Sequence, residues 1–454
     1  MTTSSTGVDR ARLARLTERE NALFAERHPG SGAAAAGAAR TLLGGVPMPW
    51  MARWPTPYPI RVERAEGATV IDVDGNHYVD FCLGDSAAMA GHAPAAVSAA
   101  VAAQVTRGIT CLLPGAGDAE IAGELARRFG LPLWQFALSA TDANRFVLRL
   151  AREVTGRRKV LVFAHCYHGT VDETIVLPED GRAVPRPDSV GPGADPDVTT
   201  KVVDFNDVAA LGAALAEGDV ACVLTEPALT NIGIVEPEPG FHDALRRLTR
   251  ETGTLLVIDE THTWSAGPGG YTALHGLQPD VLTIGKAIGG GVPAAAYALT
   301  EEVAQRVRAL TAPGVAPKTK GVGGTLAGNA LTMAAIRATL TDVLTDDAFA
   351  AMTALADRFA DGVRATIDQH ALPWHVSTLG ARAEYQFTPH APRGGIEAAV
   401  AGDRDLDRYL RLHLINRGVL MTPFHCMALM SPATTAADVD RHTDVFAAAV
   451  AELL

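Results

Sequence analysis

Short apolar runs that end in charged residues organise the middle of the chain. Residues 255–258 and 281–284 carry no charge, which is typical of strands buried on both faces of a parallel sheet. The first run ends at Asp259 and Glu260, and the second ends at Gly285 and Lys286, with more glycines at 289–291. The pattern therefore predicts two strands that bring opposite charges to one edge of a sheet.

Alternating helical and strand patterns begin near Gly91 and predict a parallel sheet with helices on its faces. Two further strands end near residues 163 and 225. Before the first of these strands, apolar residues at helical spacing predict a helix that begins at 139–142 and ends at Gly156. A helix start rich in hydroxyl residues presents backbone N–H groups that bind phosphate, although an ordinary N-cap is the alternative.

The two ends of the chain predict a smaller α+β domain. Residues 9–28 suit a helix, 30–37 suit a mobile linker, and 69–73 and 77–81 flank a hairpin turn. Towards the C-terminus, 349–363 has helical spacing, 380–387 alternates as a strand, and 412–432 resembles a second hairpin. We expect a helix, loop and hairpin in 1–85, a large domain in 86–330 and the rest of the small domain in 331–454.

Composition narrows the possible functions. The 454 residues carry a net charge of −12, which argues against nucleic acid and anionic membrane surfaces as partners. We find neither a signal-peptide pattern nor an apolar run of 18 residues. The five cysteines are scattered, as in a protein of the reducing cytoplasm, so we expect a cytoplasmic protein.

Candidate chemistry gathers at the ends of the predicted strands. Lys286 is one of only five lysines and alone follows an apolar strand, where partial desolvation favours the neutral amine that forms a Schiff base. A simple ion pair with Asp259 is the alternative. Tyr167 lies beyond the strand ending at 163, and Glu226 and Asn231 follow the strand ending at 225. An amine, a carboxylate, an aromatic ring, an amide and a phosphate-binding helix start together indicate pyridoxal phosphate (PLP) chemistry.

From about residue 40 onward the chain resembles a known family. The segments LSATDANRFVLRLAREVTGRRKVLVFAHCYHG, EPALTNIG, LLVIDETHT, LTIGKAIGGG and GGTLAGN resemble, in order, the motifs of class III (fold type I) PLP-dependent aminotransferases. The branch that holds glutamate-1-semialdehyde aminomutase and bacterial β-amino-acid transaminases is the most similar. The resemblance implies a large α/β domain with a mostly parallel seven-stranded sheet flanked by helices, and a small α+β domain built from both chain ends.

The resemblance also implies roles for individual residues. Lys286 would hold the cofactor as a Schiff base and carry the proton, and Asp259 would keep the pyridine nitrogen protonated. Tyr167 would stack on one face of the ring, opposite Thr261, where the family usually has Val. The other residues expected to bind the cofactor are Ser139, Ala140, Thr141, Glu226, Asn231, His262 and, from the neighbouring subunit of a homodimer, Thr325. The family has Gly at the position of Ala140, and no metal is expected.

The predicted activity is transfer of an amino group from an amine or amino acid to a keto acid or aldehyde. An aminomutase, which moves the group within one substrate, is the alternative. A non-catalytic PLP-fold binding protein is a second alternative, which the presence of both Lys286 and Asp259 disfavours.

The substrate side departs from the relatives. Met48 and Phe424 stand where β-amino-acid transaminases place carboxylate-binding arginines. An apolar substrate pocket between Trp50, Trp54 and Phe424, with His425 and Arg382 at its rim, is therefore favoured, because an unpaired buried carboxylate is costly. Two alternatives stay open. Arg382 could bind a carboxylate, or it could pair with Glu384 on the domain surface.

Overall fold

The computed structural model describes residues 6–187, 189–191, 194–310 and 320–454. The chain forms two compact units. The larger comprises 95–346 and 392–400, and the smaller comprises 1–94, 347–391 and 401–454. The sequence analysis divided the chain after residues 85 and 330, whereas the structure divides it after Pro94 and Asp346.

A seven-stranded sheet forms the centre of the larger unit. Its strands, in spatial order, are β4 (Leu133–Ala137), β12 (Ala295–Leu299), β11 (Val281–Ile284), β10 (Leu255–Asp259), β9 (Val220–Thr225), β5 (Lys159–Phe163) and β8 (Thr200–Val203). In this sheet β12 alone runs antiparallel to its neighbours. Every residue of β9, β10 and β11 is buried, and Asp259 at the end of β10 is the one charged residue among them. The predicted mostly parallel, seven-stranded sheet is confirmed.

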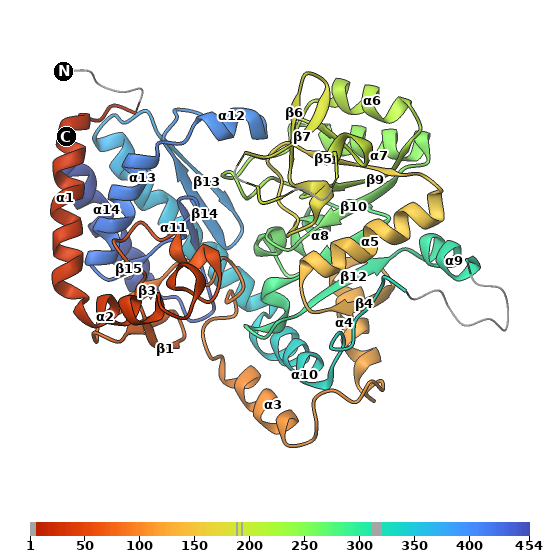
Figure 1. Cartoon of the computed structure of the whole chain (residues 1–454), viewed down its shortest axis with the longest axis horizontal. Helices are drawn as coiled ribbons and strands as arrows, with labels where there is room; N and C mark the ends of the chain where they lie inside the picture. The colour runs from red at the N-terminus through yellow and green to blue at the C-terminus, as the bar shows by residue number, and fades with distance from the viewer. Residues whose placement is uncertain (1–5, 188, 192–193, 311–319) are drawn as a thin grey trace. The chain divides into compact units, whose positions relative to one another are not determined.

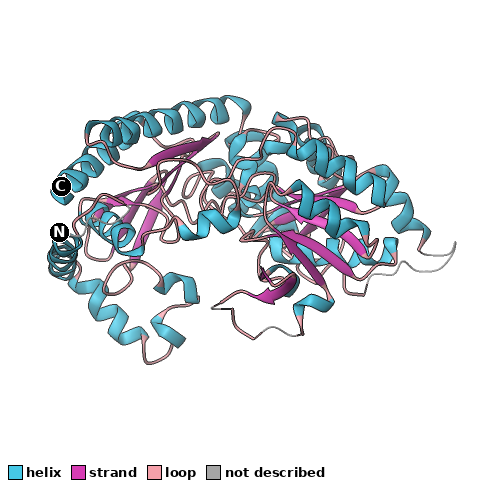
Figure 2. Ribbon diagram, turned by 90° about the horizontal axis from the view of Figure 1, so that it is seen from above, coloured by secondary structure: helices cyan, strands magenta, loops and turns pink. Residues whose placement is uncertain are grey.

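Helices surround this sheet (Figure 2). The helices of the larger unit are α3 (Ala95–Val105), α4 (Asp118–Phe129), α5 (Ala140–Thr155), α6 (Val208–Ala216), α7 (Phe241–Thr252), α8 (Gly270–Leu274), α9 (Glu301–Ala309), α10 (Ala330–Ala338) and α12 (Gly395–Val400). The predicted helix, α5, begins after Ser139 and stops at Gly156, whose φ of 69° suits glycine. It packs across β9, β11 and β12 (Figure 1). A separate hairpin joins β6 (Val176–Glu179) to β7 (Arg182–Pro185).

The smaller unit holds two sheets and the ends of the chain. One sheet contains β1 (Val62–Glu66), β2 (Thr69–Asp72), β3 (His77–Asp80) and β15 (Val419–Leu420), and the other contains β13 (His375–Leu379), β14 (Arg382–Gln386) and β16 (Met427–Leu429). Its helices are α1 (Arg10–Arg27), α2 (Pro29–Ala38), α11 (Asp346–Gln369), α13 (Arg404–Asn416) and α14 (Ala436–Leu453). The red α1 packs against the blue α13 and α14, so the two chain ends lie side by side (Figure 1). None of the described helices combines the length and apolar character that a bilayer crossing requires.

Two predictions for this unit are wrong. Residues 30–37 lie within helix α2 instead of forming a linker, because the carboxylate of Asp74 accepts hydrogen bonds from the N–H groups of Gly30 (2.6 Å) and Ser31 (2.9 Å) and caps the helix. Residues 412–432 do not form a hairpin. Their first five residues end α13, and β15 and β16 then join different sheets, β15 beside β3 and β16 beside β14.

Candidate functional site

The carboxyl ends of β9, β10 and β11 meet at one edge of the large sheet. Ile258 of β10 lies beside Thr225 of β9, and Asp259 lies beside Thr283 of β11. Glu226, Asp259 and Lys286 therefore follow three neighbouring strands, as the sequence predicts. This edge of an open α/β sheet is where ligands bind.

Lys286 has an unusual backbone. Its φ of 51° lies in the left-handed region, which costs a non-glycine residue on the order of 1 kcal/mol or more and is typical of functional sites. The preceding Gly285 is needed for space, because a Cβ there would lie 2.9 Å from the Cβ of Ala140. The Nζ atom of Lys286 is in hydrogen-bond contact with Nε2 of His262. The backbone at Gly285 thus lies against the start of α5, while the amine of Lys286 contacts an imidazole.

Asp259 is buried within a set of donors. Its Oδ2 accepts from Asn144 Nδ2 (2.8 Å) and lies 2.9 Å from His168 Nδ1, and its Oδ1 accepts from the N–H of Thr261 (3.0 Å). Burial raises the pKa of Asp259, but the hydrogen bond and the charge of His168 outweigh it, so that the pKa is lowered. Burial opposes protonation of His168, yet neighbouring Cys166 and Asp259 raise its pKa to about 10. Asp259 therefore stays ionised at neutral pH, paired with a protonated His168.

Asn144 and His168 were not among the residues predicted from the sequence. Both side chains are buried, and the hydroxyl of Thr283 on β11 donates to Asn144 Oδ1 (2.8 Å), which turns its amide nitrogen towards Asp259. A polar residue within the predicted apolar stripe of α5 was the available signal for Asn144. His168 lies next to Tyr167 in the segment HCYHG, where only the aromatic ring was selected.

The start of α5 forms a cradle. Ser139 caps the helix by accepting from the N–H of Asp142 (3.2 Å), and the N–H groups of the first turn have no partner within the helix. Thr141 Oγ1 accepts from the N–H of Thr170 (3.1 Å), and a Cβ on Gly169 would lie 2.1 Å from that oxygen. Gly169 also has a φ of 82°. The loop after Tyr167 therefore closes tightly onto the predicted phosphate-binding turn.

Glu226 links the remaining predicted cofactor residues. This buried carboxylate accepts from the backbone N–H of Tyr167 (3.0 Å), from the N–H of Thr230 (3.0 Å) and from Asn231 Nδ2 (3.2 Å). Tyr167 and Asn231, which lie on different loops, are thus brought together through one side chain. In this arrangement Glu226 positions both residues.

The predicted substrate residues lie in the smaller unit and do not all gather. Arg382 and Glu384 pair at 3.1 Å, and Glu384 also contacts His425 Nδ1 at 2.7 Å. Each of the paired side chains is only 1% exposed, so this pair is buried and does not lie on the domain surface. The guanidinium of Arg382 is therefore already neutralised by a carboxylate.

Trp50 and Phe424 meet edge to face, with ring centroids 5.5 Å apart. Trp54 instead packs against the small-unit core of Phe24 and Tyr78. The exposed guanidinium of Arg53 lies 5.4 Å from the Phe424 ring centroid. Sequence analysis did not select Arg53, although it stands in the same loop as Met48.

Thr325 is exposed and lines a hollow of about 690 Å³ on the larger unit. Two apolar side chains of its lining are exposed, Leu112 by 79% and Leu113 by 78%, and Leu326, next to Thr325 in the sequence, is 52% exposed. Contiguous exposed apolar side chains mark interaction surfaces.

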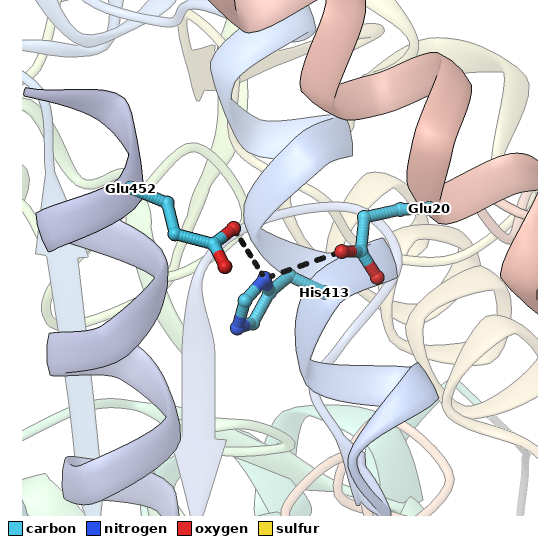
Figure 3. Close-up of side chains that lie close together, drawn as sticks. All are labelled: Glu20, His413 and Glu452. Atoms are coloured by element: carbon cyan, nitrogen blue, oxygen red, sulfur yellow. Dashed lines mark ion pairs between the residues drawn. The ribbon is translucent and has the colours of Figure 1, made fainter.

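Glu20, His413 and Glu452 lie close enough to share a metal ion (Figure 3). His413 Nδ1 is 3.7 Å from Glu20 and 3.8 Å from Glu452. Arg19 pairs with both carboxylates and Arg417 pairs with Glu20, so two guanidinium groups already neutralise them. Burial and Arg417 lower the pKa of His413 to about 4. We therefore interpret this cluster as a structural ion-pair network that holds α1, α13 and α14 together.

The larger unit fits PLP by its own chemistry. An amine and an ionised carboxylate lie at neighbouring strand ends, and the N–H groups that would hold a phosphate open the first turn of α5. Glycines at 169 and 285 occur where any Cβ would collide with that turn. A lysine amine and a carboxylate for the ring nitrogen are the two groups by which proteins hold and tune PLP.

Comparison with known proteins agrees with this fit. The family model for class III aminotransferases matches residues 50–450. Glutamate-1-semialdehyde 2,1-aminomutase of Chloroflexus aggregans is 36% identical over 448 residues, covering 94% of this chain and 99% of the relative. The crystal structure of a glutamate-1-semialdehyde aminomutase (K286A) from Pseudomonas aeruginosa PAO1 in complex with PMP matches with a TM-score of 0.96 and 51% identity, over 99% of this chain and 100% of that one. An omega-transaminase from Sphaerobacter thermophilus matches with a TM-score of 0.86 and 27% identity, over 94% and 99%.

Proposed function

The chain belongs to the class III aminotransferases, and on that premise we propose that it moves an amino group from an amine or amino acid donor to a keto acid or aldehyde acceptor. Its cofactor is pyridoxal 5′-phosphate. The observation that carries the proposal is the placement of Lys286 and the Asp259–His168 pair at neighbouring ends of β10 and β11. When bound, the cofactor supplies an aldehyde that captures amino groups and a ring that withdraws electrons.

The residues of this chain would divide the work. Lys286 would bind the cofactor carbon through Nζ and move a proton at the substrate carbon. Asp259, kept ionised by His168, would hold a proton on the ring nitrogen. The first turn of α5 would bind the phosphate, and Tyr167, Thr261 and Asn231 would orient the ring. A visible absorption band in the purified protein, absent from Lys286→Ala, is the first test.

An aminomutase is the second candidate. The 51% identity to the Pseudomonas enzyme, over essentially the whole of both chains, favours it. A single-turnover experiment separates the two activities. A transaminase releases a keto product and retains the amino group on the cofactor, whereas a mutase returns the group to its own intermediate and releases an isomer of the substrate.

We propose that the protein is a homodimer in which Thr325 reaches the phosphate of the neighbouring subunit's cofactor. The exposed apolar side chains beside Thr325 support this proposal, because a partner would cover them. Thr325→Ala should weaken cofactor binding without dissociating the dimer, as measured by cofactor titration and sedimentation. A fully active monomer would contradict the proposal.

For the substrate, we propose an apolar amine or amino ketone bound beside Trp50 and Phe424. The engagement of Arg382 by Glu384 supports this, since a paired guanidinium is a poor anchor for a second carboxylate. The test compares an apolar monoamine with its ω-carboxylate analogue in the wild type, Arg382→Ala and Arg53→Ala. A strong preference for the carboxylate that disappears in either variant would identify that arginine as an anchor and refute the apolar pocket.

A further inference from the structure

Behind Lys286 runs a line of hydrogen-bonded side chains. Lys286 Nζ contacts His262 Nε2, and His262 Nδ1 lies 3.2 Å from the hydroxyl of Thr230. The same hydroxyl is in hydrogen-bond contact with Oε2 of Glu226. Glu226, Thr230 and His262 are all buried. The line thus joins the ends of β9, β10 and β11 through residues that water does not reach.

The carboxylate sets the direction of every hydrogen bond in this line. Glu226 receives four donors, from Tyr167, Asn231 and both the N–H and the hydroxyl of Thr230, so it acts as an acceptor throughout. The Thr230 hydroxyl must therefore donate to Glu226, which leaves its oxygen to accept from His262 Nδ1–H. A neutral imidazole with its proton on Nδ1 presents a lone pair at Nε2. That lone pair faces the amine of Lys286.

We propose that His262 is the proton partner of Lys286, and that Glu226 and Thr230 hold it in the tautomer that this role requires. The inference rests on the proposed function, because only a lysine that reacts as a neutral amine needs such a partner. Whenever Nζ is not bonded to a carbonyl carbon, the lysine can lose its proton to His262. An N–H bond of the ammonium breaks, an N–H bond forms at Nε2, and the electron pair stays on Nζ for attack. The resulting imidazolium still donates through Nδ1 towards Thr230 and Glu226.

The other acidic groups at this edge have different partners. Asp259 accepts from Asn144 and pairs with His168. Glu260 accepts from the hydroxyl of Thr263 and from the N–H groups of Tyr271 and Thr272. His262 is thus the imidazole that the structure places on the amine, backed by Glu226 through one hydroxyl.

The test measures the reactivity of the amine without relying on turnover. Full-length protein freed of cofactor is treated with a limiting amine-acylating reagent over a range of pH, and labelling of Lys286 is followed by peptide mass spectrometry. We expect His262→Gln and Thr230→Val each to slow the labelling of Lys286 near pH 7 about tenfold, because no imidazole then stands ready to accept the proton that the lysine must lose before it attacks. Thr230→Ser, which keeps the hydroxyl, should restore the wild-type profile.

A matched control is available one residue before Glu226. The buried hydroxyl of Thr225 donates to the backbone oxygen of Glu226 and not to its carboxylate. Thr225→Val therefore removes a buried hydroxyl of the same kind from outside the line, and its profile should match the wild type. Nitrogen NMR of His262 should report a proton on Nδ1 and none on Nε2 near neutral pH.

Two outcomes would overturn the inference: a Thr230→Val profile that superimposes on the wild type, or a proton on Nε2 of His262. Borohydride reduction of the loaded protein keeps this failure distinct from failure of the proposed function. If the cofactor still maps to Lys286 while the profiles coincide, the proton partnership is wrong and the function stands. If no cofactor maps to Lys286, the function itself fails.

Discussion

The buried ion pair between Asp259 and His168 should make a large electrostatic contribution to the stability of the larger unit. The side chains are 3% and 0% exposed, and Asn144 and the backbone of Thr261 complete the shell around the carboxylate. His168→Ala removes the charged partner and leaves a buried carboxylate. Breaking a buried pair in this way costs about 3–5 kcal/mol. At roughly 2 °C per kcal/mol for a unit of this size, the melting temperature should fall by about 6–10 °C.

Calorimetry against a matched control is the assay. Arg247 pairs with Glu251 on the same unit, but these side chains are 57% and 56% exposed, so Arg247→Ala should cost only about 0.5 kcal/mol. The pKa of His168 is raised from 6.5 to about 10. The stability that protonated His168 contributes is therefore full below pH 6.5 and is lost as pH rises towards 10. The difference in melting temperature between wild type and His168→Ala should narrow over that range. Equal losses in the two variants would refute the reasoning.

Two further predictions concern the close packing at Gly285 and the ion-pair network around Glu20. Gly285→Ala places a Cβ 2.9 Å from that of Ala140, so it should lower the free energy of unfolding by about 1–3 kcal/mol and weaken cofactor binding. Adding Ala140→Gly should restore most of the stability and of the binding. Thermal melts and cofactor titration of the single and double variants check this. Arg417→Ala should lower the free energy of unfolding by about 2–3 kcal/mol, and not more, because Arg19 still pairs with the buried Glu20. The exposed Arg358→Ala is the control and should cost less than about 1 kcal/mol. Burial raises the pKa of Glu20, but its hydrogen-bond partners outweigh this and lower the pKa from 4.5 to about 2. The stability that ionised Glu20 contributes is therefore full above pH 4.5 and should fade as pH falls towards 2. A stability difference between wild type and Arg417→Ala that does not change with pH would contradict this.

The sequence predicted the strands, and the placement of Asp259 and Lys286 at their ends, because the signals are local. Charge-free runs ending at Asp259 and Lys286 determine both the burial of β10 and β11 and the edge where the charges emerge. A capping serine and a terminal glycine likewise bound α5. Each of these features depends on residues within one turn or one strand.

The features that the sequence did not predict depend on contacts between distant segments. Helix α2 is capped by Asp74, more than thirty residues away, so its alanine and glycine composition alone suggested a linker. His168 reaches Asp259 only because β5 and β10, with β9 between them, end at the same edge of the sheet. Arg382 alternates with Glu384 as a surface pair would, and only the sheet around them shows that both are buried.

The central claim is that Lys286 holds the cofactor, and borohydride reduction of the purified protein followed by peptide mapping tests it most directly. Lys320, and Lys318 outside the described residues, are the nearby rivals in the sequence, but they stand in the polar segment APKTKGVGG and not at the end of an apolar strand. The account predicts a reduced pyridoxyl group on residue 286 alone. A label on either rival, or no label at residue 286, would contradict it.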